Sequence, residues 1–359
     1  MKILIYGDCH FSTYSSIVRR RGERYSERLN NLIQSINWAE NLGNEMNVDS
    51  VVCLGDFFDA PNLTAEEITA LGDIVWCNAP HSFLVGNHEV GRKDMTTSSA
   101  HIFLGTDDGH NVFGVSHFMV EYKPHSYKIP VGHYVLDLCF LPYIFEDERK
   151  TIEEYFPKID APTRKIIFSH NDIKGLQLGG FVSKAGFDID DIENNCSLFI
   201  NGHLHNGSKI SDKIINCGNL TGQNFGEDAS TYDHVALVLD TDDLKIAVFE
   251  NPYAFNFYKL DVVEKSEIEF DKIITGLKNN AVLSIRCSES LVSHIKERLS
   301  GSNNVSEYRL VIVRDRTTAD VKSTKELNSV DHLKMFSDFI LKELGTSDVI
   351  VSELGEVCQ

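Results

Sequence analysis

The chain has 359 residues, of which 42% are hydrophobic and 24% are charged, and its formal net charge is −19 at pH 7. This length allows one large core and a second, smaller unit, and the composition is that of an ordinary globular protein. No apolar run reaches the roughly 20 residues of a membrane helix, and residues 1–6 predict a strand rather than a signal peptide, so we expect a cytoplasmic protein.

The excess negative charge argues at first against a nucleic-acid partner, because DNA binding draws on basic surface. Carboxylates neutralised by bound cations, or basic surface supplied by a partner subunit, would reconcile the two. The eight cysteines occur singly, without a CxxC pair, and several lie in apolar stretches, such as those around Cys53 and Cys139. We therefore expect reduced, buried thiols rather than disulfides or a zinc framework.

Strands and helices alternate in the first part of the chain. In order, the apolar patterns predict strand 2–7, helix 25–46, strand 48–54, helix 64–77 and strand 81–85. Thr64 is the expected N-cap of the second helix, and Glu67 completes a capping box. The order βαβαβ is typical of an α/β fold, in which helices cover a sheet.

Strands dominate the middle of the chain. We predict them mainly at 112–115, 117–123, 134–141, 165–169, 198–201, 208–217, 233–239 and 245–250. Together with the first part, they predict an α/β (α+β) fold in which two sheets pack face to face with helices outside, a four-layer αββα sandwich.

The last hundred residues have a different pattern. An α-β-α-β succession at 266–277, 281–287, 289–299 and 308–313 precedes a polar stretch, 315–325, and an amphipathic helix, 327–344. We therefore expect a main domain over residues 1–263, a small α/β cap over residues 264–314, and a linker with a terminal helix over residues 315–359.

Polar clusters follow five of the predicted strands, at the edge where α/β folds place their sites. They are Asp8-x-His10, Gly55-Asp56, Gly86–Glu89, His170 and Gly202–His205. Alternate residues of an extended segment face the same side, so the Asp-x-His and His-x-His pairs each direct two ligand atoms at one site if the segment stays extended. Mixed carboxylate, amide and imidazole ligands without thiolate predict a pair of divalent cations, for which Mn²⁺, Fe²⁺ or Zn²⁺ is better suited than Mg²⁺ or Ca²⁺.

The ordered set matches the metallophosphoesterase signature D-x-H, G-D, G-N-H-[DE], H, G-H-x-H. Each piece alone is as well explained by turn residues and core histidines; the set is not. Within that superfamily the chain resembles the SbcD-type nucleases of double-strand-break repair, in particular short bacteriophage versions. Supporting residues are Asp59, Gly175 and the segment Asn224–Glu227, whereas residues 216–219 replace the Pro-Gly-Ser of many relatives.

The resemblance implies a ligand set for two metals, about 3.5–4 Å apart, that clamp a phosphodiester and activate water. One metal would be held by Asp8, His10, Asp56 and His205, and the other by Asp56, Asn87, His170 and His203, with Asp56 as the bridge. His88 matches a catalytic histidine that contacts the scissile phosphate or protonates the leaving oxygen. Asp59 is expected to support the site. Mn²⁺ is the expected metal.

Three further features of the sequence concern binding to DNA, to a second copy of the chain and to an ATPase. Arg19, Arg20 and Arg21 either grip DNA phosphates or form a solvated loop. The helix at 64–77 packs in the core only, or also forms the two-fold contact of a homodimer, as in relatives. Leu333, Phe336, Phe339 and Ile340 line one face of the terminal helix; its family counterpart docks on an SbcC-like ABC-type coiled-coil ATPase, and the alternative is that the helix covers the cap.

The expected function is that of a metal-dependent DNA exo/endonuclease subunit of an SbcCD-like repair and recombination complex. A metallophosphatase or cyclic-nucleotide phosphodiesterase of the same fold would share the metal motifs but lack the cap and the amphipathic tail. A non-catalytic scaffold is the alternative from another class, and the intact set of seven ligands argues against it.

Overall fold

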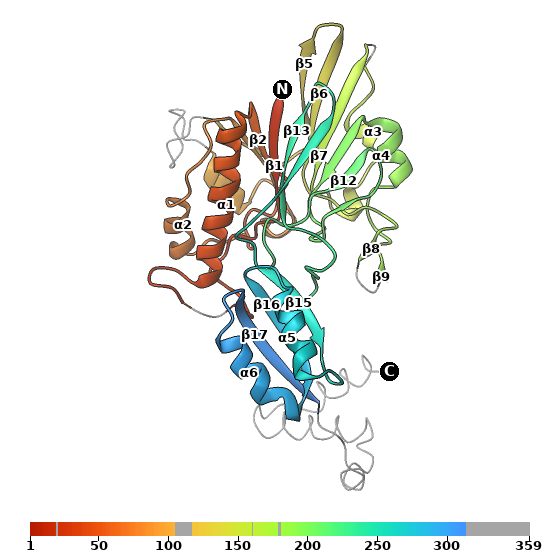
Figure 1. Ribbon diagram of the computed structural model, residues 1–359. Helices are drawn as coiled ribbons and strands as arrows, with labels where there is room; N and C mark the ends of the chain where they lie inside the picture. Colours follow the sequence, from red (N-terminus) through yellow and green to blue (C-terminus); the bar gives the residue numbers. More distant parts are fainter. Residues whose placement is uncertain (19–20, 105–116, 160, 179–180, 314–359) are drawn as a thin grey trace, which may run out of the picture. The chain divides into compact units, whose positions relative to one another are not determined.

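Two six-stranded sheets form the body of the protein (Figure 1). The computed structural model describes residues 1–18, 21–104, 117–159, 161–178 and 181–313. The first sheet, in spatial order, contains β14 (Lys245–Glu250), β13 (Val235–Asp240), β1 (Lys2–Tyr6), β2 (Ser50–Cys53), β3 (His81–Leu84) and β4 (Phe118–Glu121). The second contains β11 (Ser208–Lys209), β12 (Ile214–Asn216), β10 (Leu198–Asn201), β7 (Thr163–Ser169), β6 (Tyr134–Leu141) and β5 (His125–Val131).

Helices lie outside the two sheets. They are α1 (Glu27–Met46) and α2 (Ala65–Leu71) beside the first sheet, and α3 (Ile152–Tyr155) and α4 (Ile189–Asn195) beside the second. Short 3₁₀ turns at Ser99–Phe103, Glu146–Glu148 and Glu289–Leu291, and a two-stranded ribbon of β8 (Gln177–Leu178) and β9 (Phe181–Val182), complete the connections.

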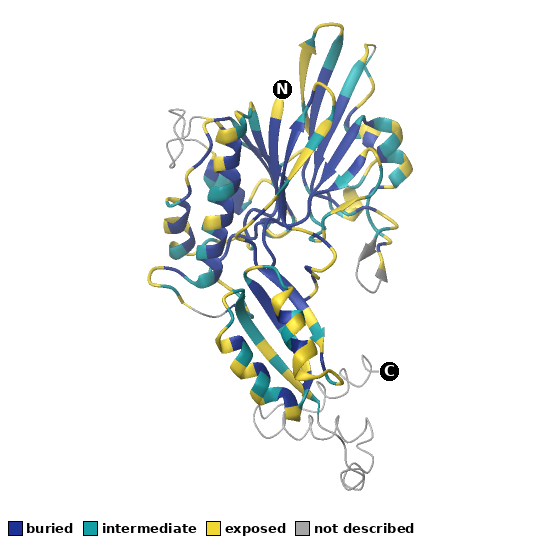
Figure 2. Cartoon of the chain, in the orientation of Figure 1, coloured by how far each residue is buried: buried dark blue, intermediate teal, exposed yellow. Residues whose placement is uncertain are grey.

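The alternation of side chains along β1 shows how the layers are held together. Ile3 and Ile5 point into the core between the sheets, whereas Leu4 and Tyr6 belong to the core under α1 and α2. A third core packs α3 and α4 against the other face of the second sheet. Figure 2 shows buried residues along both sheets. The predicted four-layer αββα sandwich is therefore confirmed.

The helix predicted at 64–77 is shorter than expected. Its start is as predicted, because Thr64 and Glu67 form the capping box, but the helix ends at Leu71. The following chain leaves the helix because side chains of α1 accept its backbone N–H groups: Asn37 Oδ1 binds Val75 N, and Glu40 Oε2 binds Cys77 N. Tertiary hydrogen bonds therefore override the helical pattern of residues 72–77.

A separate three-stranded sheet follows the sandwich; we call it the cap sheet. It contains β15 (Asn256–Asp261), β16 (Ala281–Ser288) and β17 (Val305–Val313), with α5 (Glu267–Thr275) and α6 (Val292–Ser300) packed on one face. The α-β-α-β succession is as predicted, and β15 is an additional strand. The domain boundaries stay a prediction. The strand expected at 112–115, the linker 315–325 and the helix 327–344 lie outside the described residues.

The seven cysteines of the described ranges are all free and buried, as expected for reduced thiols. Among the same residues, every helix is too short or too polar to cross a bilayer.

Candidate metal centre

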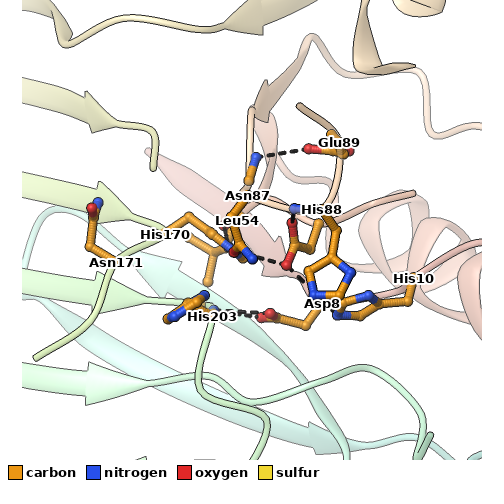
Figure 3. Close-up of polar contacts among 12 residues, drawn as sticks. Asp8, His10, Leu54, Asn87, His88, Glu89, His170, Asn171 and His203 are labelled. Carbon is orange, nitrogen blue, oxygen red and sulfur yellow. Dashed lines mark hydrogen bonds and ion pairs between the residues drawn. The ribbon is translucent and has the colours of Figure 1, made fainter. Parts of the chain in front are cut away.

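The predicted site residues follow strands whose carboxyl ends meet. In the first sheet β1, β2 and β3 are parallel neighbours, and Asp8, Asp56 and Asn87 follow them. In the second sheet β7 and β10 are also parallel, and they lead into His170 and His203. Figure 3 shows the side chains of Asp8, Asn87, His170 and His203 converging at the ends of these strands.

Three overlapping groups of side chains are arranged so that a metal ion could bind. Within each group the ligand atoms lie within 4.8 Å of one another. The groups are Asp8–His10–His205, His10–Asp56–His88 and Asp56–His170–His203. Asn87 joins the last group, with its Oδ1 3.4 Å from His170 Nε2. The structure thus brings together all seven predicted ligands, and Asp56 is common to two of the groups.

The protonation pattern of His10 and His205 favours a cation between them. His10 Nδ1 lies 3.0 Å from Asp59 Oδ1, and His205 Nδ1 lies 3.1 Å from Glu227 Oε1. Because carboxylates only accept, both Nδ1 atoms carry a proton, so Nε2 is the nitrogen of each ring that could bind a metal. The two Nε2 atoms face each other at 3.2 Å. A divalent ion could take the place of the proton that they share, so the donor set fits a metal ion.

The same reasoning applies to His170. Its Nδ1 donates to the carbonyl oxygen of Leu54 at 2.7 Å, and its Nε2 lies 3.1 Å from Asp56 Oδ2, where a bound metal would replace the proton of the ion pair. Burial alone would raise the pKa of Asp56, but the charges of His170 and His10 hold it well below its usual range. An ionised, buried carboxylate surrounded by imidazole nitrogens and an amide oxygen is a suitable bridge between two divalent ions.

The backbone of the site is strained. Four of the predicted ligands have positive φ angles: 49° at Asp8, 47° at His10, 45° at Asp56 and 72° at His203. The Asp8-x-His10 segment is not extended, since both residues lie in the left-handed region. The condition under which we expected alternation to direct both side chains at one site is therefore not met. Such conformations cost about 1–3 kcal/mol each and persist where the surrounding structure enforces them, as at functional sites.

The glycines of the motifs act mainly by leaving space. Of Gly55, Gly86 and Gly202, only Gly55 has a positive φ angle, of 101°. A Cβ atom on Gly86 would overlap Asp56 Oδ1, and one on Gly202 would lie 2.9 Å from Asp8 Oδ2. Gly86 and Gly202 therefore let two carboxylates lie directly against the backbone.

His88 lies at the open side of the centre, with its side chain 44% exposed. Its Nδ1 is 3.4 Å from Asp59 Oδ1 and 3.3 Å from the Asp59 carbonyl oxygen, so Nδ1 is the donor and Nε2 is left for another partner. The hydrogen bond to Asp59 raises the pKa of His88 to about 9. Asp59 thus orients both His10 and His88, which agrees with its expected supporting role.

Three further carboxylates support the centre, and one of them, Asp172, had little signal in the sequence. Asp172 Oδ1 lies 3.2 Å from His203 Nε2, and buried Glu227 contacts His205. Glu89 is also buried and accepts from the backbone N–H groups of Gly86 and Phe58 at 2.8 and 3.1 Å, which fixes the loop between them. Proximity to His170 in the sequence was the only signal for Asp172.

A cleft of about 810 Å³ adjoins the centre. Its walls include His203 and His205 with their supporting carboxylates, and also Leu176, Ile210 and Tyr232. This volume suits a small organic ligand or part of a larger one.

Of the residues predicted to contact DNA or the ATPase, only Arg21 lies within the described residues. Arg21 is exposed and pairs with Glu66, with Nη2 3.1 Å from Oε2, so its charge is partly balanced within the chain. Arg19 and Arg20 lie outside the described residues, as do Leu333, Phe336, Phe339 and Ile340.

Comparison with known proteins identifies the family of the chain. Two crystal structures resemble the chain at low identity: a dimetal phosphatase from Danio rerio (12% identity, TM-score 0.36, covering 70% of this chain and 98% of that one) and TT1561 from Thermus thermophilus (10%, 0.39, 69% and 98%). None of the curated proteins matches. Residues 1–207 match the family model of the calcineurin-like phosphoesterases. The chain therefore belongs to the calcineurin-like phosphoesterases, which are metal-dependent hydrolases of phosphoesters.

Proposed function

We propose that this phosphoesterase is a DNA nuclease that hydrolyses phosphodiester bonds as a subunit of an SbcCD-like complex in the cytoplasm. Asp8, His10, Asp56 and His205 would hold one divalent ion, and Asp56, Asn87, His170 and His203 the other, with Mn²⁺ as the preferred metal. Bound there, the ions would polarise the phosphate and lower the pKa of water.

The side chains around the metals have defined roles in this proposal. Asp59 holds His88 by Nδ1, so His88 presents Nε2 on the open side, where a phosphate oxygen or a leaving group would lie. Asp172 and Glu227 fix the orientation of the imidazoles of His203 and His205. Metal-bound histidines commonly have such carboxylate partners.

The observation that carries the choice of DNA is the face of the cap sheet opposite α5 and α6. Exposed Lys259 is paired in register with Ser284, and Ser284 accepts a 3.0 Å hydrogen bond from Nε of Arg309, so a polar row crosses the three strands. Exposed Arg286 lies on the same face and pairs with Asp261. The three basic residues Lys259, Arg286 and Arg309 exceed the two carboxylates of this face, Asp261 and Glu307, by one charge. In a chain of net charge −19, such a face favours a polyanionic substrate.

A small-molecule substrate is the alternative, and the 810 Å³ cleft beside His203 and His205 favours it. A phosphate monoester or a cyclic nucleotide would fit a cleft of this size and would not need the cap sheet. A non-catalytic scaffold is less well supported, because the structure brings all seven expected ligands together.

The partners belong to the same proposal. We propose that Leu333, Phe336, Phe339 and Ile340 dock on an ABC-type coiled-coil ATPase, and that two copies of the chain form a homodimer. Exposed Ile68 of α2 (47%) and Val75 (61%) support a contact in the region predicted for that dimer.

The test compares substrates on one preparation. Linear and hairpin DNA, bis(p-nitrophenyl) phosphate, p-nitrophenyl phosphate and a cyclic nucleotide are assayed with Mn²⁺ and with Mg²⁺, with and without the ATPase. We expect cleavage of DNA and of the diester in Mn²⁺, and none with His88→Gln. Preference for the monoester or for the cyclic nucleotide, without DNA cleavage, would favour the alternative.

A further inference from the structure

The loop of residues 222–229, here called the Glu227 loop, contacts two of the three ligands of one metal group, His205 and Asp8. Glu227 Oε1 lies 3.1 Å from Nδ1 of His205. Gln223 Nε2 donates to the carbonyl oxygen of Asp8 at 3.0 Å. Buried Arg28 donates to the carbonyl oxygens of Gly222 (2.8 Å) and of Cys9 (3.3 Å), and Cys9 lies between Asp8 and His10. The loop therefore supports His205 and Asp8 directly, and Arg28 connects it to the backbone between Asp8 and His10.

The carboxylate of Glu227 is itself held rigidly. The residue is only 4% exposed, and its oxygens accept from Asn219 Nδ2 at 3.0 Å and from the backbone nitrogen of Gln223 at 3.0 Å. A buried acceptor held by two donors fixes both the ring orientation and the tautomer of His205, and it increases the basicity of the ligand nitrogen.

The cap sheet anchors the same loop at three points. The backbone nitrogen of Gly222 donates to Phe255 O, next to β15, and that of Ala229 donates to Phe257 O in β15, each at 3.0 Å. Between these bonds, the Phe225 side chain is buried with Val18, Phe255, Phe257 and Val282. On β17, the guanidinium of Arg309 lies 4.3 Å from the centre of the Phe225 ring.

The other metal group is supported elsewhere. His170 is oriented by the carbonyl oxygen of Leu54, and His203 by Asp172. Neither Leu54 nor Asp172 belongs to the Glu227 loop or to the cap sheet. The two groups therefore differ in what orients their histidines, although Asp8 Oδ1 also accepts from the backbone nitrogen of His203 at 2.9 Å.

We propose that Glu227 is a positioning residue for His205 and that the cap sheet, acting through the Glu227 loop, sets the metal affinity of the Asp8–His10–His205 group alone. This inference rests on the proposed metal centre but not on DNA as the substrate. A ligand or partner that shifts the cap sheet would then change the occupancy of one metal and leave the other in place.

The first experiment measures stepwise metal binding by calorimetry with Mn²⁺, on the full chain. Loss of a supporting carboxylate lowers metal affinity by about 10–100-fold. We expect Glu227→Gln to weaken one binding step by about tenfold and Glu227→Ala by more, with the other step unchanged. Asp172→Asn is the matched control and is expected to weaken the other step. Equal weakening of both steps by Glu227→Gln, or no weakening, would overturn the assignment.

The second experiment tests the cap sheet without touching the centre. Arg309→Ala removes the cation from Phe225, and Arg286→Ala removes a second exposed arginine of the same face that pairs with Asp261 instead. We expect Arg309→Ala to weaken the step affected by Glu227→Gln by a few fold, and Arg286→Ala to leave it unchanged. Identical affinities for the two arginine variants would refute the link through the cap sheet.

Thermal unfolding of the metal-free protein in EDTA distinguishes a positioning role of Glu227 from a general effect on folding. Glu227→Gln should keep its melting temperature in EDTA within a few degrees, since the amide retains one acceptor for the loop, yet lose metal affinity. If the affinity falls only in proportion to apo-protein stability, Glu227 is merely structural and the proposal fails. Because no readout uses DNA, failure of the nuclease assay would leave this test intact.

Discussion

The peptide nitrogen of His88 donates a 2.9 Å hydrogen bond to Oδ1 of Asp56, so the loop that carries His88 is bound to the carboxylate shared by two of the metal groups. The other oxygen, Oδ2, faces His170 at 3.1 Å and His10 at 3.8 Å. One side chain thus shapes the loop with one oxygen and faces the metal ligands with the other.

Asp56→Asn should therefore lose both metals while the protein stays folded. The amide can still accept from His88, but it no longer supplies the negative charge that holds two cations together. Elemental analysis after gel filtration should fall from two ions per chain to none, whereas His10→Ala should mainly empty one site. Asp147→Asn, which removes an exposed carboxylate paired with Lys93, is the control. Two ions retained in Asp56→Asn would show that the residue is not the bridge.

His88→Gln should abolish phosphodiester cleavage and leave the metal content nearly unchanged. The reason is that His88 Nδ1 is bound to Asp59 and its side chain is 44% exposed, against 2% for the expected ligand His10, so His88 can reach a bound phosphate. His125→Gln, at an exposed histidine of β5, controls for loss of an imidazole. Metal loss together with activity would identify His88 as a ligand, as its place in one of the three groups allows.

Asp59→Asn should lower kcat by about 10–100-fold, as expected when a carboxylate that orients catalytic or ligand imidazoles is removed. Asp59 Oδ1 lies 3.0 Å from His10 Nδ1 and 3.4 Å from His88 Nδ1, so the variant loses the charge that orients both rings. KM for bis(p-nitrophenyl) phosphate should change less than kcat. An unchanged kcat would mean that the two rings are held in place by other contacts.

Removal of metal should destabilise the folded chain. Without a metal, the ionised Asp56 and the buried imidazoles of His10 and His170 lose the cations that would bind them. Free metal at about 100 times its Kd stabilises a protein by about 2.7 kcal/mol. Melting temperatures in EDTA should thus be several degrees lower than in Mn²⁺ and should rise with metal concentration. A melting curve independent of metal would contradict the site.

Truncation after Arg316 should leave a folded, metal-loaded phosphoesterase that no longer co-purifies with the ATPase. An apolar helix face left in water is unfavourable, so docking on another chain is the economical explanation for the expected helix. In the full chain, Phe336→Ala together with Phe339→Ala should have the same effect, and Lys334→Ala, on the expected polar side, should not. Aggregation of the truncated chain, or full binding to the ATPase, would assign the segment to the core instead.

The sequence predicted which side chains meet at the ends of the strands, because the expected ligands follow strands directly. An apolar strand that ends in Asp8 or Asp56 fixes both the sheet edge and the order of the ligands. The supporting carboxylates were harder to find, since Glu227 reaches His205 only through the path of a long loop. The end of α2 could not be predicted either, because it depends on Asn37 and Glu40 of a different helix. The need for glycine at position 86 likewise depends on contact with the carboxylate of Asp56, which follows a different strand.

The buried thiols make the chain a convenient subject for labelling chemistry. Only the thiolate of an accessible cysteine reacts rapidly with a maleimide; the seven cysteines of the described ranges are buried, and burial raises the pKa of the Cys196 thiol to about 12. With Cys358 replaced by serine, a cysteine introduced at exposed Lys259 should be the one fast-reacting thiol. A fluorophore or spin label attached there would report on the cap sheet while both metals are titrated.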